Sequence, residues 1–173
     1  MTAERFHTVV VKVENKAGVL ARVAGLFARR GFNIESLAVA PTDDERFSRI
    51  TFTVDVASAP LEQVVKQLDK LVNVVDIREL DAATAVEREL MLIVVAAAPE
   101  RRSELLDLVR IFKAKVLSVG PDKMMVSLSG RPDRIDDFEA LLEPFGIVEI
   151  QRTGRVALRR LDSSAIDETP EVP

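Results

Sequence analysis

Two periods of hydrophobicity alternate along the first 80 residues of the chain. Runs in which apolar and polar residues alternate, many of them β-branched, predict strands. Apolar residues spaced by three and four positions predict amphipathic helices. The resulting order, β-α-β-β-α-β, is typical of a ferredoxin-like unit, in which two helices cover one face of a four-stranded antiparallel sheet. The strands are expected at residues 7–14, 33–40, 47–56 and 74–77, and the helices at 18–30 and 60–71.

Glycines mark the middle and the end of the first helix. Gly31 follows it where a left-handed C-cap is expected, and the two arginines before Gly31 suit the negative end of the helix dipole. Gly25 lies in mid-helix, where glycine costs up to about 1 kcal/mol relative to alanine. We therefore expect the helix to lie close against the sheet at Gly25.

The same order of elements returns in the second half of the chain. Strands are expected at residues 90–98, 116–119, 124–128 and 147–150, and helices at 100–112 and from 131 onward. The sequence thus predicts an α+β protein of two tandem ferredoxin-like units, residues 5–80 and 87–161, with a small polar linker at 81–86. Residues 155–161 receive no firm assignment.

The tail, residues 162–173, differs in composition from the rest. It holds four acidic residues, two prolines and no lysine or arginine, so we expect it to be disordered. The formal net charge of the chain is −4, which leaves residues 1–161 neutral and without the basic footprint of a nucleic-acid-binding protein. Phe47 and Phe52 also fall on opposite faces of their predicted strand, where they cannot stack bases together. No nucleic-acid partner is expected.

Other classes are excluded by what the sequence lacks. It has no cysteine, hence no disulfide and no cysteine-based metal site. The longest apolar run, at residues 90–98, is far shorter than the roughly 20 residues of a membrane helix. The first eight residues do not have the pattern of a secretory signal, so a cytoplasmic location without membrane contact is expected.

The sequence offers little for catalysis. His7 is the sole imidazole and is expected at the surface of the first strand. The acidic run at residues 43–45 is typical of a solvated turn rather than of a metal site. A small enzyme on this fold would need a clustered acid–base pair, and the sequence indicates none.

The turn between the first strand and the first helix is the candidate site. A strand that leads directly into a helix leaves the amides of residues 17–20 without intrahelical acceptors, and such amides bind carboxylates. Asparagine side chains can pair with ammonium or carboxylate groups and aliphatic side chains can line a pocket, so a free branched-chain amino acid would fit. The residues concerned are Asn15, Gly18, Val19, Leu20, Asn33 and Ile34. The alternative is an ordinary N-cap turn, in which asparagine and glycine serve geometry alone.

Longer stretches resemble a known family. Residues 13–23 (VENKAGVLARV) resemble the opening of an ACT domain, an amino-acid-sensing form of this fold. Residues 25–37 (GLFARRGFNIESL), with Pro41-Thr42-Asp43, Ser48-Arg49 and residues 86–90 (VEREL), are similar to the regulatory (small) subunit of acetohydroxyacid synthase, also called acetolactate synthase. The resemblance covers residues 5–161.

The resemblance implies a non-catalytic subunit that activates a separate catalytic (large) subunit and confers feedback inhibition by valine in branched-chain amino acid biosynthesis. It places thiamine diphosphate, Mg and FAD on that partner and no cofactor in this chain. It also implies a homodimer formed through the ACT domains, with valine bound at their interface.

The same resemblance divides the effector contacts between two chains. Asn15, Gly18, Val19 and Leu20 would come from one chain, and Asn33 and Ile34 from the other. Ala38-Val39 stands where the family often has Thr-Val, which leaves the preference among valine, leucine and isoleucine open. Residues 87–89 are the first candidate for the surface that contacts the catalytic subunit. The alternative is that these charged residues are only the solvent-exposed start of a strand. The alternative function is a free-standing ACT-type sensor that controls another enzyme or a transcription regulator.

Overall fold

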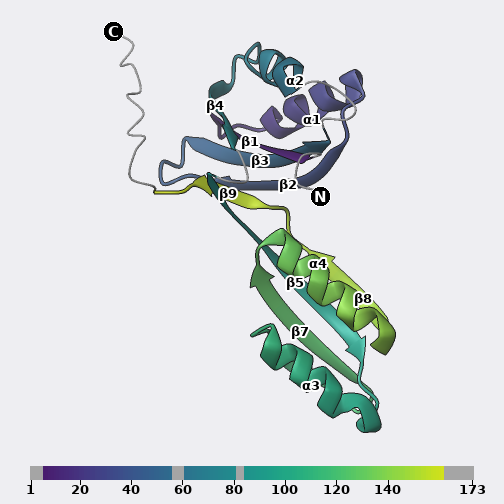
Figure 1. Cartoon of the computed structure of the whole chain (residues 1–173). Coiled ribbons are helices and arrows are strands. Elements are labelled where there is room, and N and C mark those ends of the chain that lie inside the picture. The colour runs from purple at the N-terminus through teal and green to yellow at the C-terminus, as the bar shows by residue number, and fades with distance from the viewer. Residues whose placement is uncertain (1–5, 56–60, 81–83, 162–173) are drawn as a thin grey trace.

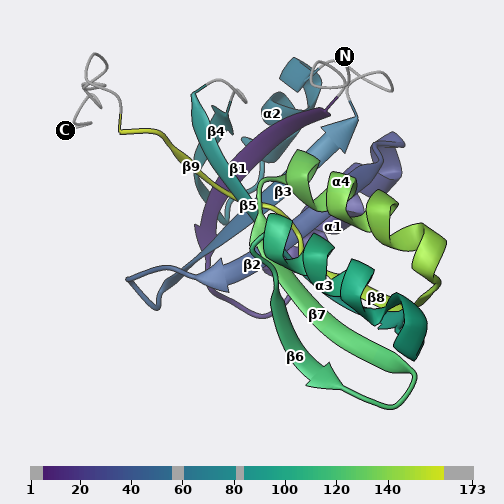
Figure 2. The ribbon, with the colours of Figure 1, turned by 60° about the horizontal axis from the view of Figure 1, so that its bottom comes forward.

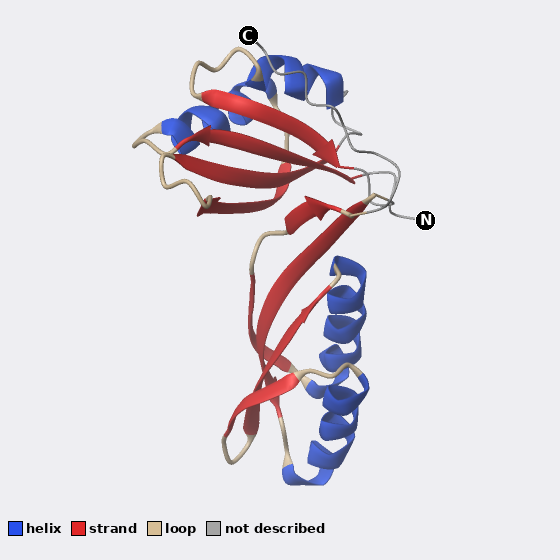
Figure 3. Cartoon of the chain, turned by 90° about the vertical axis from the view of Figure 1, so that its left-hand side faces the viewer, coloured by secondary structure: helices blue, strands red, loops and turns tan. Residues whose placement is uncertain are grey.

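The computed structural model describes residues 6–55, 61–80 and 84–161, which form two ferredoxin-like units, and one long strand of the second unit extends onto the first (Figure 1). In each unit two helices lie on one face of a four-stranded antiparallel sheet (Figure 3). The expected fold class is confirmed. The acidic tail, residues 162–173, lies outside the described residues, as do residues 56, 60 and 81–83 of the expected elements.

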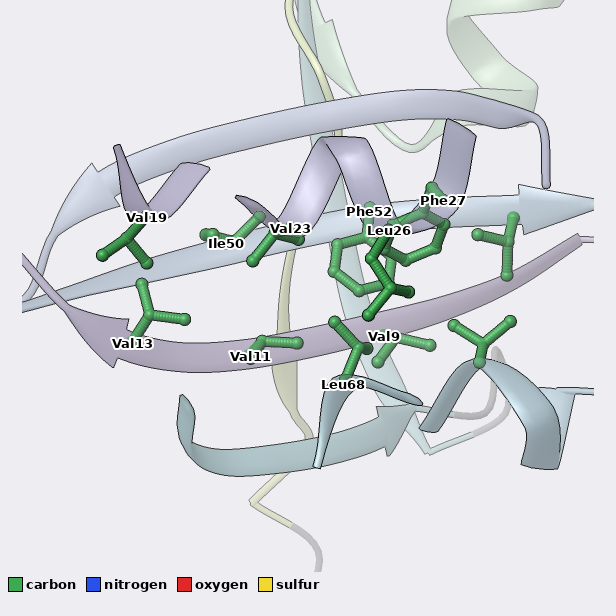
Figure 4. Close-up of a cluster of buried hydrophobic side chains, with 12 residues drawn as sticks. Val9, Val11, Val13, Val19, Val23, Leu26, Phe27, Ile50, Phe52 and Leu68 are labelled. Atoms are coloured by element: carbon green, nitrogen blue, oxygen red, sulfur yellow. The ribbon is translucent and has the colours of Figure 1, made fainter. Parts of the chain in front are cut away.

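The N-terminal unit consists of β1 (Phe6–Glu14), α1 (Val19–Arg30), β2 (Ile34–Pro41), β3 (Phe47–Asp55), α2 (Leu61–Leu68) and β4 (Val74–Leu80). Its sheet has the order β2-β3-β1-β4, so β2 is an edge strand. The core lies between the sheet and the helices, where alternate valines of β1 meet the apolar stripe of α1 (Figure 4). The ring of Phe27 from α1 packs edge-on against Phe52 of β3, with 4.7 Å between the ring centroids.

The two glycine expectations for α1 have opposite outcomes. Gly31 adopts the left-handed conformation with φ 70°, and the Phe32 amide donates to Phe27 O across the helix end, so the C-cap is confirmed. The expectation that α1 approaches the sheet at Gly25 is wrong. A Cβ atom on Gly25 would meet only the end of the flexible Arg29 side chain, at 3.2 Å. Gly25 lies beside the stripe of α1 that faces the sheet, not within it.

The C-terminal unit repeats the arrangement with β5 (Ala85–Ala96), α3 (Arg102–Ile111), β6 (Lys115–Val119), β7 (Lys123–Gly130), α4 (Pro132–Leu142) and β8 (Ile147–Arg152). Its strand order is β6-β7-β5-β8, and the β6–β7 hairpin lies on the side away from the N-terminal unit (Figure 2). The buried face of β5 presents Met91, Ile93 and Val95 to the two helices, which contribute Leu105 and Phe138 among others. Each unit therefore has its own core.

One strand was not expected. Residues 155–161, which the sequence left unassigned, contain β9 (Val156–Arg159), and β9 pairs antiparallel with Ala85–Arg88 of β5. The predicted linker at residues 81–86 is consequently too long, because its last two residues already belong to β5. Similarly, α2 ends at Leu68 and not at Leu71. The elements that were missed or misjudged are short and are fixed by contacts distant in sequence.

The β5–β9 ribbon covers part of the helix-free face of the N-terminal sheet. Ala85 and Ala157 of the ribbon pack against Val10 of β1 and Leu80 of β4, and all four side chains are buried. β5 thus pairs with β9 over the N-terminal unit and continues into the C-terminal sheet between β7 and β8. One continuous strand therefore contacts the face of the N-terminal unit and forms part of the C-terminal sheet.

A buried carboxylate lies where β5 passes from one unit to the other. Glu89 is only 5% exposed, and its two oxygens bind Arg152 Nη2 at 2.6 Å and Arg155 Nε at 2.8 Å. Burial alone would lower the pKa of Arg152, but its hydrogen bonds to Glu89 and Asp136 outweigh burial and raise it. Nearby, Glu87 accepts a hydrogen bond from Thr8 on β1. The alternative interpretation, in which residues 87–89 are a solvent-exposed strand start, is wrong for Glu89 because this side chain is buried.

The loop between β8 and β9 touches edge strand β2 through its backbone. The Arg155 amide donates to Ser36 Oγ at 2.7 Å, and a Cβ atom on Gly154 would lie 2.0 Å from Leu37 O. No side chain fits between the loop and β2 at this point. Glycine is therefore required at position 154 for the two units to make this contact.

Substituting Glu89 by alanine is expected to destabilise the protein strongly. The change leaves the partly buried guanidinium groups of Arg152 and Arg155 without their shared partner, and removing one member of a buried ion pair costs about 3 kcal/mol or more. Urea unfolding followed by circular dichroism measures the loss. Glu62→Ala is the matched control, because the Glu62–Lys66 pair is exposed and should contribute less than about 1 kcal/mol. Equal effects of the two changes would contradict the assigned role of Glu89.

Gly154→Ala is expected to lower the melting temperature by several degrees. The new methyl group overlaps the β2 backbone, and overpacking of this kind costs about 1–3 kcal/mol. Differential scanning calorimetry measures the change. Gly120→Ala is the control, because the nearest atom to its Cβ, Lys123 O, lies 3.5 Å away. A Gly154→Ala protein that melts like the Gly120→Ala protein would exclude the close contact with β2.

Candidate functional site

The turn from β1 into α1 is held in place from two sides. The Asn15 amide donates to Arg46 O at 2.7 Å, and Asn15 Nδ2 donates to Glu45 O at 2.9 Å. On the other side, the Glu14 carboxylate accepts a hydrogen bond from Asn73 Nδ2. The side-chain nitrogen of Asn15 is thus committed to the β2–β3 loop, whereas its Oδ1 has no partner among the residues that the structure describes. Asn15 Oδ1 can therefore accept a hydrogen bond from a ligand, while one of the two hydrogens on Nδ2 is used by Glu45 O.

The loop that Asn15 binds is itself ordered by local hydrogen bonds. Asp44 accepts from the backbone amide and the guanidinium of Arg46, and these contacts lower the pKa of Asp44 to about 2. Thr42 Oγ1 donates to Asp44 O at 2.9 Å. The acidic run at residues 43–45 therefore forms a turn with an internal ion pair. The loop offers a fixed backbone against which Asn15 is positioned.

The start of α1 exposes backbone amides. Gly18 has φ 84°, a left-handed conformation that an L side chain rarely adopts, and no side chain caps the helix there. Of the amides expected to be unpaired, that of Val19 donates to Lys16 O at 3.3 Å, so it is not available. The amides of Gly18 and Leu20 have no acceptor within the described part of the chain. These two N–H groups, at the positive end of the helix dipole, can bind an anion.

The side chains expected to line the pocket have different environments. Leu20 is 42% exposed and borders the turn. Val19 is only 4% exposed because its side chain belongs to the core of the N-terminal unit, so the expectation that it lines a ligand pocket is wrong. Ile34 is partly buried against the same core. Of these three predicted residues, Leu20 alone presents a well-exposed apolar side chain beside the exposed amides.

Asn33 and Ile34 lie at the opposite end of α1 from Asn15. The helix has 12 residues, which span about 18 Å at 1.5 Å per residue. Two pockets in the described part of the chain are lined by none of the six predicted site residues. A single chain therefore carries two separate half-sites: Asn15, Gly18 and Leu20 at one end of α1, and Asn33 and Ile34 at the other.

Edge strand β2 connects the two half-sites. It begins at Ile34, directly after Asn33, and ends at Pro41, before the loop that Asn15 binds. Leu37 and Val39 on its helix-side face are exposed, and they are opposite the core residues Phe52 and Ile50 in the register with β3. An apolar surface on an unpaired strand edge is a typical place for a second chain to bind.

One pocket of the described structure was not expected from the sequence. It is an open groove of about 800 Å³ between the β2–β3 hairpin and the β5–β9 ribbon. Its lining includes Arg49 of β3 and Arg88 of β5. Because β9 could not be assigned from the sequence, no pattern indicated that these segments would meet.

None of the described helices is long and apolar enough to cross a membrane.

Comparison with known proteins identifies the family over both units. Residues 9–76 match a family model described as an AHAS small subunit-like ACT domain, and residues 88–161 match one described as the small subunit of acetolactate synthase. The chain is 47% identical over 154 residues to a probable acetolactate synthase small subunit from Archaeoglobus fulgidus, covering 89% of this chain and 96% of the relative. It is 49% identical over 154 residues to a putative acetolactate synthase small subunit from Mycobacterium tuberculosis, covering 89% and 92%.

A solved structure agrees with these relatives. The acetolactate synthase small subunit from Thermotoga maritima superimposes with a TM-score of 0.82 at 38% identity, covering 92% of this chain and 99% of that one. The agreement extends over both ferredoxin-like units and not only over the ACT domain. The chain belongs to the family of acetolactate synthase small subunits, the regulatory subunits with an N-terminal ACT domain.

Proposed function

We propose that this chain is a non-catalytic subunit that activates the catalytic subunit of acetolactate synthase and makes it sensitive to inhibition by valine. The observation that carries the proposal is the match to small subunits of this enzyme over nearly the whole chain, with both units included. Thiamine diphosphate, Mg and FAD belong, in this proposal, to the catalytic subunit. This chain supplies an effector site and surfaces that contact the partner.

The effector site forms between two copies of the chain. If β2 pairs antiparallel with β2 of a second copy about a two-fold axis, the start of each strand lies beside the end of the other. The Asn33 end of the partner's β2 then approaches the Pro41 end, where the β2–β3 loop binds Asn15. The pairing joins one half-site from each chain, and it covers the exposed Leu37 and Val39. The dimer therefore completes two equivalent sites.

Each group of a free amino acid has a complementary group in this arrangement. The carboxylate binds the Gly18 and Leu20 amides at the start of α1. The ammonium donates to Asn15 Oδ1, which has no other donor in the described structure, and to the side chain of the second copy's Asn33. The aliphatic side chain packs between Leu20 and Ile34. Valine, leucine and isoleucine all satisfy the same polar contacts, so the apolar pocket decides among them.

Binding at this interface regulates the enzyme through a difference in affinity. Valine shifts the enzyme toward the inhibited state only as far as it binds that state more tightly, typically by 1–3 kcal/mol, or about 5- to 150-fold. Valine tightens the ACT dimer because each chain supplies half of its contacts. The change reaches the catalytic subunit through the surfaces that hold the two subunits together.

Reconstitution with the catalytic subunit of the same organism tests the proposal. Acetolactate formation is expected to rise when this chain is added and to fall again as valine is titrated in, because activation and inhibition both depend on the small subunit. Stimulation without any response to valine, leucine or isoleucine would contradict the effector site. No stimulation at any subunit ratio would favour a free-standing amino-acid sensor instead.

Asn33→Ala is expected to abolish inhibition by valine and to leave activation unchanged. The change removes one partner of the ammonium group from each site, while α1, β2 and the core remain intact. The concentration of valine that gives half inhibition is measured on the reconstituted enzyme. Gln151→Ala, at an exposed position of β8 in the other unit, removes an amide of the same kind as a control. Loss of activation and inhibition together in Asn33→Ala would count against separate effector and partner surfaces.

A further inference from the structure

The groove between the two units has an apolar lining. Residues of the β2–β3 hairpin form one wall and residues of the β5–β9 ribbon the other. Figure 1 shows β9 next to β2 on the side of the N-terminal sheet that carries no helix. With a volume of about 800 Å³, it lies in the range of cavities that hold ligands. The apolar lining residues include Ala38, Ala40, Pro41, Val86, Val156 and Leu158.

Two of these side chains are exposed on a narrow ribbon. Val156 is 55% exposed and Leu158 is 60% exposed, although both belong to β9, whose alternate residue Ala157 is buried against the N-terminal sheet. Apolar side chains clustered beside a groove of this size indicate a surface that another segment covers.

The charges around the groove are predominantly positive. Four arginines line it, against one acidic residue, Asp43; the arginines are Arg49, Arg88, Arg159 and Arg160. Arg49 lies on β3 and Arg88 on β5, so the positive charge comes from both walls. Arginine binds carboxylates through a planar, bidentate group and also packs on apolar surfaces. The groove is therefore suited to a segment that is acidic and partly apolar.

The chain itself supplies such a segment at the rim of the groove. Leu161 lines the groove and is the last described residue. The twelve residues that follow, 162–173, contain four acidic residues, no lysine or arginine, and the apolar residues Ala165, Ile166 and Val172. Twelve residues reach up to about 40 Å when extended, which is ample for a groove that begins where the segment begins. Attachment at the rim also gives the segment a millimolar effective concentration.

We propose that residues 162–173 bind in this groove of their own chain, with their carboxylates against Arg49 and Arg88 and Ile166 on the apolar wall. The match to the small-subunit family model ends at residue 161, so the tail adds to this chain a contact beyond the matched region. Occupancy of the groove covers Val156 and Leu158 and secures β9 on β5. The inference does not depend on the effector site, which lies elsewhere.

Cysteine pairs test the contact directly, because the natural chain contains no cysteine. The pair Ser164→Cys and Ala40→Cys joins the tail to the groove, whereas the control pair Ser164→Cys and Ser118→Cys joins the tail to β6 at the far edge of the C-terminal sheet (Figure 2). In full-length protein in a glutathione redox buffer, the groove pair is expected to form an intrachain disulfide with an effective concentration at least about tenfold above that of the control. Equal values for the two pairs would overturn the proposal.

Charge supplies the second arm of the experiment. Arg49→Glu with Arg88→Glu, added to the groove pair, is expected to reduce its effective concentration to the control value, and 0.5 M NaCl should act in the same direction on the unaltered arginines. The salt arm keeps the test valid if the double charge reversal unfolds the protein, which circular dichroism reports. Insensitivity to both changes would overturn the role of the arginines. Disulfides between chains, seen as dimers on a non-reducing gel, would overturn the intrachain contact in favour of a second copy.

Discussion

The arrangement of the molecule depends on one continuous strand that belongs to two sheets. β5 pairs with β9 at its start and with β7 and β8 along the rest of its length. A strand hydrogen-bonded along its length cannot rotate about its backbone as a flexible linker does. The orientation of the two units is therefore set by the packing of the β5–β9 ribbon on the N-terminal sheet and by the contacts of the 153–155 loop with β2.

Glu89 shows how much a single polar residue contributes to that arrangement. It lies on the face of β5 that carries Met91, Ile93 and Val95, where an apolar residue would be ordinary. The Glu89 carboxylate instead forms ion pairs with Arg152 of β8 and with Arg155 of the loop before β9. A buried charge of this kind adds little net stability compared with an apolar core, but it tolerates few alternative arrangements, because any shift leaves it unpaired. We attribute the position of the 153–155 loop to this constraint.

The sequence predicted the repeated units well because each depends on local periodicity. The Gly31 cap, the helical stripe at Val19, Val23 and Leu26, and the alternation of β1 were all readable within a few residues. The spacing of this stripe also indicates that Val19 is buried, which argues against a place for its side chain in a ligand pocket. β9 was missed because four residues, Val-Ala-Leu-Arg, carry no period by themselves and gain a partner only about 70 positions away. A charged residue such as Glu89 gives no sign in the sequence that it is buried.

The path of the chain has a consequence for the order in which the protein is made. Residues 6–80 contain every element of the N-terminal unit, so that unit can fold as soon as it leaves the ribosome. Its helix-free face, however, receives Ala85 and Ala157 from opposite ends of the second unit. The side chains of Val10 and Leu80 therefore stay partly exposed to solvent until nearly the whole chain has been synthesised. A nascent chain that stalls before residue 157 presents a folded N-terminal unit with an incompletely covered apolar surface, which favours aggregation.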